Sequence, residues 1–345
     1  MPTKQWFSRR GKVLFNRKKT LVSRSFSDQY PVLFIKANMP SRGAAVIAAM
    51  LVVAIAASLA ALVFERQQLA VRSIENRMDA SQIRWIERAA SDWARLVLRL
   101  DARTTTMDHL GEPWAMSIQQ TELDPTVYGG ARAGTKDAKA VLSGQIQDAQ
   151  ARFNLRNLLQ TLDQGQSDRS SQAGQLSALD LQALRKLLAA IGLDASYAEV
   201  IAAYALSPGF GRAADLLLVP GIDQTIYERM ERYMIVLPQR SAININTASA
   251  ELLHAYLSGL DLASAQVLVK RREEQAFSDL SALRSRLSMA EELPAARFTV
   301  LSRYFFMEGV IGYGRVSSRA RILYDRNPQS TSDGEVVSVV WRETL

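Results

Sequence analysis

The longest uninterrupted hydrophobic run of the chain covers residues 44–64, with Ala44 and Phe64 as its ends. It contains no charged residue, no glycine and no proline. At 1.5 Å per residue, a helix of this length spans roughly 31 Å, which is the thickness of the hydrocarbon core of a bilayer. Helices buried in soluble proteins rarely lack polar positions on every side over such a length. The pattern therefore predicts a membrane-spanning helix.

After residue 64 the hydrophobic positions become periodic, and no glycine or proline occurs in residues 44–110. The apolar positions mostly recur every three to five residues, with Arg and Glu between them: Leu69, Ile74, Met78, Ile86, Ala89, Trp93, Val97 and Leu100. This spacing predicts one helix of about 55 residues, whose amphipathic half at 65–105 lies against a folded domain along one face. Two alternatives remain open: a signal anchor followed by an unrelated helix, and a signal peptide cut near Ala60.

The rest of the chain changes from loop to helical to strand patterns. Residues 108–114 end the helix, and 114–142 hold loop residues with short strand candidates before 144–155 lead into helical sequence. Helices are predicted at 176–190, 195–205, 212–218, 224–234, 248–257 and 262–275. Strands are predicted at 298–307, 316–325 and 335–341, with Gly309, Gly312, Gly314 and Asp333-Gly334 in the turns. Helices between early and late strands predict an α+β protein whose sheet is interrupted by a large helical insertion.

Basic charge is concentrated at the N-terminus. The whole chain has a formal net charge of +8, but residues 1–43 hold ten basic residues and one acid. Residues 44–345 are left with 32 basic against 33 acidic residues. Basic residues before a membrane helix predict a cytoplasmic N-terminus and a body on the far side of the membrane. A near-neutral body argues against nucleic-acid binding, which needs basic residues gathered on one surface.

Few residues offer catalytic or metal-binding chemistry. The chain has no cysteine and two histidines, His109 and His254, so thiolate sites and a multi-histidine zinc site are excluded. Asp108 and Glu112 near His109 would suit acid–base chemistry, but a loop histidine at the end of a helix is the simpler interpretation. His254 is expected to be partly buried in a helix. With neither a Walker loop nor a Gly-x-Ser-x-Gly motif, the sequence predicts no enzyme.

The junction of the basic tail and the hydrophobic run carries a resemblance. Ser41-Arg42-Gly43 stands directly before Ala44. A short basic stretch ending in glycine, then an apolar run that merges into an amphipathic helix, resembles the class III leader of type IV pilins and pseudopilins. In that family a prepilin peptidase cuts after the glycine, which implies cleavage between Gly43 and Ala44. Most members have a glutamate at the fifth mature position, where this chain has Ala48.

The lack of that glutamate is characteristic of the minor pseudopilin K family of type II secretion. The segment QIQDAQARFNLRNLL at 145–159 also resembles the stretch of that family that leads from its sheet into its helical domain. In a filament, the glutamate neutralises the terminal ammonium of a neighbouring subunit, because unpaired charges in lipid are costly. A subunit without it has no such partner to offer to a subunit beyond it. The resemblance therefore implies a position at the filament tip.

The resemblance covers residues 41–345 and implies a pilin-like long helix packed on a small antiparallel sheet. It implies these segments: a leader removed by the peptidase (1–43), the membrane half of the helix (44–64), its amphipathic half (65–105), the first part of the β domain (106–155), the helical insertion (156–297) and the final strands (298–345). The implied partners are the minor pseudopilins I and J, the pseudopilus, prepilin peptidase and inner-membrane lipid. The implied location is a single pass through the bacterial inner membrane with a periplasmic body.

Two stretches, 216–230 and 243–283, resemble helix-hairpin-helix units, and the insertion is therefore expected to be helix-hairpin-helix-like or SAM-like. In hairpins that bind DNA, a Gly-apolar-Gly turn and the following helix N-terminus hold a phosphate. Here Asp223 and Asp261 replace the second glycine, and each is expected to cap the next helix instead. Lys270-Arg271-Arg272 is expected to form a solvated helix face, since Glu273-Glu274 follows. The alternative function, a membrane-tethered DNA-binding protein of the uptake type, stays open.

Members of the pseudopilin K family can bind calcium in the helical insertion. The corresponding region here offers few acids, of which Asp194, Glu199 and Asp215 are the candidates. A calcium ion takes six to eight oxygen ligands, several of them charged. The residues themselves therefore predict no cofactor, and calcium is implied only by the resemblance to the family.

A start at Met39 would give the five-residue leader MPSRG and leave residues 1–38 outside the protein. Those 38 residues hold nine of the ten basic side chains before Ala44 and show no periodic pattern. They are expected to be either a disordered cytoplasmic leader or an over-extended gene start.

Overall fold

The structure is a computed structural model that describes residues 42–123, 139–160, 175–287, 293–294, 296–327 and 336–344. The contacts divide the chain into two units, Met1–Arg66 and Gln67–Leu345. The described part of the first unit is helical throughout and belongs to α1 (Arg42–Thr104), a helix of 63 residues. The predicted single helix is thus confirmed, and its length follows from the absence of glycine and proline in residues 44–110.

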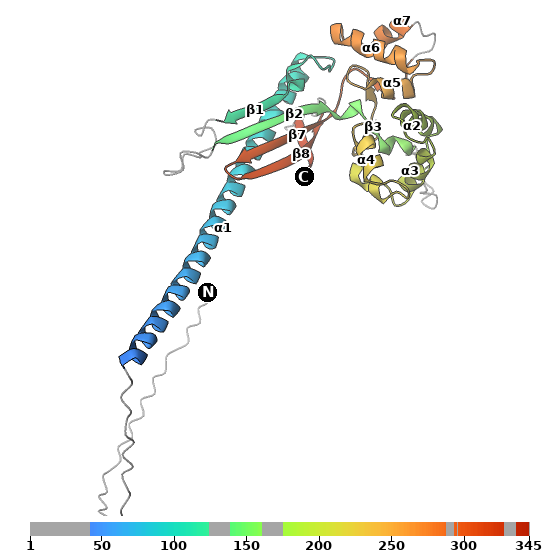
Figure 1. The fold of residues 1–345 in the computed structure, drawn as a ribbon. Helices are drawn as coiled ribbons and strands as arrows, with labels where there is room; N and C mark the ends of the chain where they lie inside the picture. The colour runs from blue at the N-terminus through green and yellow to red at the C-terminus, as the bar shows by residue number, and fades with distance from the viewer. Residues whose placement is uncertain are drawn as a thin grey trace, which may run out of the picture. The chain divides into compact units, whose positions relative to one another are not determined.

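The sheet of the second unit has five antiparallel strands in the order β1-β2-β7-β8-β9. Their bounds are β1 (Ile118–Leu123), β2 (Ala140–Asp148), β7 (Tyr304–Tyr313), β8 (Val316–Arg326) and β9 (Val337–Thr344). Figure 1 shows the green β2 beside the red β7, two strands that are far apart in the chain. The α+β class is confirmed.

The second half of α1 packs on this sheet through one face. Its buried residues recur every three to four positions: Ile83, Ile86, Ala90, Ala94 and Leu98. Ala94 and Leu98 join a cluster with Phe305, Ile322 and Tyr324 of the sheet. The predicted stripe was wrong in its membership, since Ala89, Trp93 and Leu100 are exposed while Ile86 is buried. It combined two faces of the helix, because apolar residues occupy both.

A helical insertion separates β2 from β7 in the chain. It has its own core, which 3-10 helix η3 (Leu155–Leu158) and helix α2 (Ala178–Ala190) help to form. The remaining helical elements are α3 (Tyr197–Leu206), η4 (Ala213–Leu218), α4 (Gln224–Glu231), α5 (Ala250–Tyr256), α6 (Leu262–Glu274) and α7 (Leu280–Leu287). Two short parallel ladders each pair one end of the insertion with its middle: β3 (Phe153–Asn154) with β4 (Met234–Ile235), and β5 (Ile243–Asn244) with β6 (Phe298–Thr299).

Several predicted elements need correction. The helix expected at 224–234 ends at Glu231, because Met234–Ile235 pairs as β4. The strand expected at 298–307 divides into β6 and β7, and α7 was not predicted. The residues expected to run into helical sequence at 144–155 begin inside β2. The predicted turn at Asp333-Gly334 lies outside the described residues.

Gly309 and Gly312 lie inside β7 and not in turns. Gly309 pairs with Gly144 of β2, and a Cβ at Gly144 would lie 2.8 Å from the carbonyl oxygen of Glu308. Close approach of the two backbones therefore requires glycine at this point. Gly314 does occupy a turn, with φ of 58° at the first position of the two-residue β7–β8 connection. A type II′ hairpin turn requires glycine there.

Candidate functional site

The predicted processing point lies in the first turn of α1. The helix begins at Arg42, so the bond between Gly43 and Ala44 belongs to it. Gly43 is exposed, and a Cβ built on it meets no atom within 4 Å. The fold itself therefore makes no steric demand for glycine at position 43. The leader residues 39–41 lie outside the described residues.

Residues 44–64 expose apolar side chains on every side of α1. Within the described ranges, α1 is the one helix long and apolar enough to cross a membrane, with a peak mean hydropathy of 2.8. Its one polar side chain in this stretch, Ser58, donates a 2.8 Å hydrogen bond to the carbonyl oxygen of Ala54. The hydroxyl is thus satisfied within the helix, as a hydrocarbon environment requires. The first half of α1 fits a single-pass membrane anchor.

Ala48 lies on this exposed stretch, one turn after Ala44. No residue of 44–64 carries a carboxylate. The helix therefore offers no acidic group to the amino terminus of a neighbouring helix at this depth.

A buried group of charged residues joins the end of α1 to the sheet. The Arg326 guanidinium, 1% exposed, donates from Nη1 to Oδ2 of Asp101 at 2.6 Å and from Nη2 to Oδ2 of Asp108 at 2.5 Å. It also donates to the carbonyl oxygen of Ser302 at 2.6 Å. Asp108 further accepts from the Ser302 amide at 2.5 Å. One cation thus holds two carboxylates at the end of α1, next to the point where the chain returns from the insertion.

Burial changes the protonation of these acids. It raises the pKa of Asp101 to about 7, and the nearby carboxylate of Glu112 adds to the effect while Arg326 opposes it. Burial also raises the pKa of Asp108, against the opposing effect of Arg326. Because two carboxylates next to one arginine leave an excess negative charge in a dry site, the physical solution is a proton held on Asp101.

A second buried network starts at Asp148, the last residue of β2. Its Oδ2 accepts from the hydroxyls of Thr247 and Ser302, both at 2.6 Å, and from Nδ2 of Asn244 at 3.0 Å. Burial raises the pKa of Asp148 to about 6, although these hydroxyl donors lower it. Asn244 and Thr247, at the start of the stretch 243–283 that resembles a helix-hairpin-helix unit, thus form a polar joint between the insertion and the sheet. The contacts of both networks could not be predicted from the sequence, because their members are far apart in the chain and no local pattern marks them.

The acids near His109 have structural partners. Oε2 of Glu112 accepts from the His109 amide at 2.9 Å and from Nε1 of Trp114 at 2.8 Å. The His109 ring accepts from the Gly111 amide at 3.1 Å. His254 is half-buried on α5, and its Nδ1 lies 2.6 Å from the carbonyl oxygen of Leu260. Both histidines thus lie where the sequence analysis expected them.

The hairpin turns are capped as predicted. Oδ1 of Asp223 accepts from the Ile226 amide at 2.8 Å, and Oδ1 of Asp261 accepts from the Ser264 amide at 2.7 Å. The bond from Ser264 lowers the pKa of Asp261. Each carboxylate thus occupies an amide that a phosphate would need and adds a negative charge beside it. The DNA-binding alternative finds no support in this geometry.

The expectation for Arg272 was wrong. Lys270 and Arg271 are exposed, but Arg272 is buried and donates to the carbonyl oxygen of Ile245 at 2.7 Å. Burial lowers the pKa of Arg272 to about 10. Arg272 ties α6 to the residue that follows β5, so only part of the basic cluster is solvated.

The three calcium candidates do not form one donor set. Asp194 accepts from the Ser196 amide, Glu199 binds Arg185 at 2.6 Å, and Asp215 accepts from the Gly211 amide at 2.7 Å. Within the described ranges, the one group of three acids close enough to share an ion is Asp101, Asp108 and Glu112, within 4.8 Å. Arg326 already supplies the positive charge there. In both groups, carboxylate oxygens already bind partners within the described part of the chain.

Known proteins resemble this chain over most of its length. A family model described as Type II secretion system (T2SS), protein K, matches residues 243–301. A protein of Pectobacterium carotovorum subsp. carotovorum named Type II secretion system protein K is 27% identical over 340 residues, which cover 88% of this chain and 96% of the relative. A protein of the same name from Pseudomonas aeruginosa is 25% identical over 309 residues, 79% of this chain and 85% of the relative.

A solved structure shares the fold. It is a chain from the crystal structure of the GspK-GspI-GspJ complex of the enterotoxigenic Escherichia coli Type 2 Secretion System. The match has a TM-score of 0.56 at 19% identity and covers 78% of this chain and 98% of the other. More than three quarters of this chain therefore has a known fold.

Proposed function

We infer that this chain is a minor pseudopilin of the type II secretion system, of the protein K kind, and we propose that it acts at the tip of the pseudopilus. Its mechanism is assembly by packing and not catalysis. The observation that carries the proposal is α1, a single helix of 63 residues whose first 21 residues after Gly43 are apolar on every side. The relatives match this chain across the helix, the sheet and the insertion.

Processing by prepilin peptidase between Gly43 and Ala44 is part of the proposal. The fold places no neighbour at Gly43 that would demand glycine, which agrees with a glycine requirement set by the peptidase. Cleavage there would remove all ten basic residues of 1–43 and leave an uncharged, mainly apolar stretch after the new terminus. Before cleavage, the same basic residues favour a cytoplasmic N-terminus and a periplasmic body.

Ala48 supports the tip position. An ammonium group within a bundle of apolar helices is costly unless a carboxylate lies near it. This helix has no carboxylate in residues 44–64 to offer to a subunit beyond it. The insertion adds a large folded body beside the sheet, which would hinder a further subunit from stacking there. The proposed partners are minor pseudopilins I and J, since the structural relative comes from a complex with proteins of those names.

The deciding experiment is N-terminal sequencing after co-expression with a prepilin peptidase. We expect a mature protein that begins at Ala44, and Gly43→Ala to leave a precursor because the peptidase requires glycine. A terminus at Ala61 or at Met1 would contradict the proposal. Restoration of secretion in a strain that lacks its own protein K tests the role in the same cells. Ala61→Ser, a small-residue change on the same helix, is the matched control and should restore secretion fully.

A further inference from the structure

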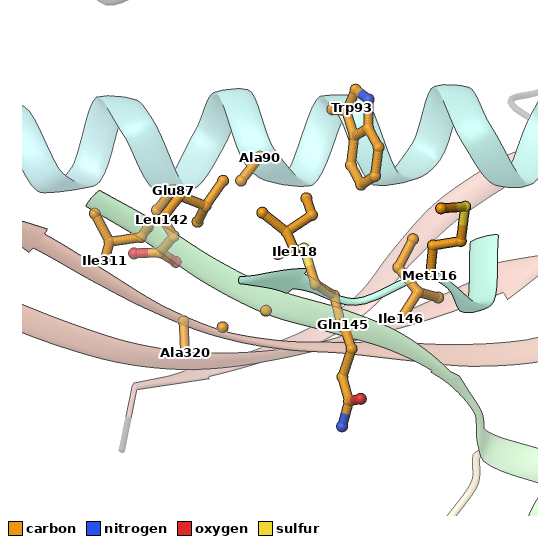
Figure 2. A pocket seen from close by; sticks show the side chains of 13 residues that line it. Glu87, Ala90, Trp93, Met116, Ile118, Leu142, Gln145, Ile146, Ile311 and Ala320 are labelled. Carbon is orange, nitrogen blue, oxygen red and sulfur yellow. The ribbon is translucent and has the colours of Figure 1, made fainter. Parts of the chain in front are cut away.

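A cleft lies on the face of the sheet opposite α1, where the sheet meets the helical insertion. It has a volume of about 620 Å³, which is within the range of ligand-binding sites. Gln145 of β2, Glu308 of β7 and Arg321 of β8 line it and are neighbours across three strands. Figure 2 shows the side chain of Gln145 pointing away from α1. Met307, which precedes Glu308, joins the cluster that contains Ala94 of α1 on the other face.

The insertion contributes a half-buried arginine to the cleft. Arg152 follows the 3-10 helix η2 (Ala149–Ala151), and its guanidinium lies 4.4 Å from the ring centre of Phe306. Nη1 donates to the carbonyl oxygen of Glu231 at 3.2 Å, and Nη2 donates to Oε1 of Gln147 at 3.0 Å. An arginine with little access to water is usually paired with a carboxylate. Arg152 forms no ion pair with any residue that the structure describes.

The acids that line the cleft are engaged by other partners. Oε1 of Glu231 accepts from Nη1 and Nη2 of Arg321, both at 3.1 Å, and Glu308 lies 3.5 Å from Nη2 of the same arginine. The third acid, Asp148, is buried, and its Oδ2 accepts from Thr247, Ser302 and Asn244. The positive charge of Arg152 is therefore left without an acid of its own.

The surroundings of Arg152 increase this excess of positive charge. Burial lowers the pKa of Arg152 to about 10, and the neighbouring guanidinium of Arg321 adds to the effect, while Glu308 and Glu231 oppose it. The Nε of Arg321 is buried and has no hydrogen-bond partner in the described ranges. Arg232, which is exposed, adds a third cation to the lining. An anionic group in the cleft would be stabilised by these charges.

The neutral part of the lining suits a peptide better than a bare ion. The hydroxyl of Ser249 accepts from the Leu252 amide at 3.2 Å, so its own hydrogen is available for donation. The amide of Gln145 offers both a donor and an acceptor, as a peptide group requires. Leu110, 54% exposed, adds an apolar contact. A small inorganic anion would use the cations alone and would leave most of the cleft empty.

We propose that this cleft binds a short acidic peptide segment of another protein, with a carboxylate of the segment paired to the guanidinium of Arg152. The planar guanidinium matches a carboxylate through two parallel hydrogen bonds, which a lysine could not form. Arg232 attracts the acid, and Gln145 and Ser249 hold the peptide groups on either side of it. The inference goes beyond the proposed function and does not depend on it, since the site belongs to the face of the sheet away from α1.

Fluorescence anisotropy on the purified, detergent-solubilised full chain tests the proposal with short labelled peptides that are blocked at both ends. One probe carries a single Glu among alanines, and the matched probe carries Gln at the same place. We expect the Glu peptide to bind at least about tenfold more tightly at low salt, because a hydrogen bond between charged groups is stronger than a neutral one. Equal affinities for the two peptides would overturn the proposal.

Sodium phosphate is the competitor that separates a peptide site from a simple anion site. We expect the unlabelled Glu peptide to displace the labelled one at a much lower concentration than phosphate does. Displacement by phosphate at the same concentration would show that the cleft recognises charge alone, and this result would overturn the proposal.

Variants of the lining test the role of each cation. Arg152→Gln should abolish the preference for Glu over Gln, and Arg152→Lys should restore only part of it, because lysine keeps the charge without the planar fork. Arg232→Gln should weaken binding of the Glu peptide about threefold, as expected for an exposed charge. Arg271→Gln, exposed on α6, is the matched control and should leave binding unchanged.

The circular dichroism spectrum and the Tm of each variant show whether it is folded. A folded Arg152→Gln that keeps the preference for Glu would overturn the proposal. If Arg152→Gln does not fold, full affinity in both Arg232→Gln and Gln145→Ala would overturn it instead. Processing at Gly43 and restoration of secretion test the proposed function separately, so the two can fail independently.

Discussion

At the scale of single residues, Asp101, Asp108 and Arg326 decide how the end of α1 is held. One guanidinium faces two buried carboxylates, and that of Glu112 lies near them, so the fully ionised group carries excess negative charge. Because burial raises the pKa of Asp101 to about 7, this residue holds the proton through mildly acidic pH. The arrangement is stable as a unit, and removal of its one cation would leave buried negative charge.

This pKa predicts the pH dependence of stability. A carboxyl whose pKa rises on folding stabilises the folded state fully below about pH 4, and that contribution is lost as the pH rises through about 7. Asp101→Asn keeps an acceptor for Arg326 and a donor for Asp108 but cannot ionise. We expect the variant to be more stable than the wild type at pH 8 by about 2 kcal/mol, and to show a flatter profile from pH 5 to 8.

The measurement is chemical denaturation of the detergent-solubilised chain across this range. Asp148, whose pKa is raised to about 6, should leave a remaining slope near that pH. Asp92→Asn, an exposed acid on the same helix, is the control and should leave the profile as it is. Equal slopes for Asp101→Asn and the wild type would show that Asp101 is ionised in the folded protein.

Residue roles were predictable from the sequence only where the partner is close in the chain. Asp223 and Asp261 cap amides three residues away, so the sequence of each turn is enough to predict the capping role. Arg272 reaches Ile245, and Arg326 reaches Asp101, 225 residues away. No pattern in a single sequence marks such pairs, because either arginine would look the same on a solvated face.

At the scale of elements, the two hairpin turns show how one substitution changes what a helix terminus can bind. Gly221 and Gly259 have φ of 86° and 81°, as in the first position of a Gly-apolar-Gly turn. The aspartates at the third position then close the site by capping. The turn geometry is thus kept while its anion-binding amides are occupied.

Asp223→Gly with Asp261→Gly should open these amides. We expect a loss of only about 0.3 kcal/mol of stability per turn, since glycine caps a helix nearly as well as aspartate. We expect the wild-type chain to show no salt-sensitive micromolar affinity for duplex DNA, and the double variant to bind more tightly than the wild type. Fluorescence anisotropy with labelled duplex at two salt concentrations measures this. Salt-sensitive micromolar binding by the wild type would restore the DNA-binding interpretation.

The case of α1 shows why periodicity predicts a helix better than it predicts its contacts. Apolar residues at intervals of three and four establish the helix over its full length. They occupy two arcs, however, and only the three-dimensional structure shows that Ile86 and Ala94 face the sheet while Trp85 and Leu100 face outward. The strands were harder to predict than the helix, because Gly144 and Gly309 resemble turn residues until the pairing of their strands is known.

At the scale of the whole molecule, the order of elements was predictable because hydrophobic runs, helical periods and strand-like composition follow one another along the chain. The pairing of β2 with β7 across the insertion is a long-range feature. It was expected only from helices lying between early and late strands. Two polar networks could not be predicted from the sequence: one joins the end of α1 to the sheet, and the other joins the insertion to the sheet.

Calcium gives a prediction at this scale. Because Asp194, Glu199 and Asp215 each have separate partners, we expect 1 mM calcium to change the Tm of the chain by less than about 1 °C relative to a chelator. The same concentration of magnesium is the matched control. Differential scanning calorimetry makes the comparison, and an increase of several degrees specific to calcium would show that the insertion holds a site.

The pairing of Asp148 with Phe305 also sets the order in which the molecule is completed. Every residue between them must be synthesised before β2 meets β7, its neighbour in the sheet. Until then Ala94 and Leu98 of α1 lack the packing partners that Phe305, Ile322 and Tyr324 provide. A chain whose synthesis is unfinished therefore has an incomplete sheet, and a subunit ready for assembly is a chain whose last strands are already in place.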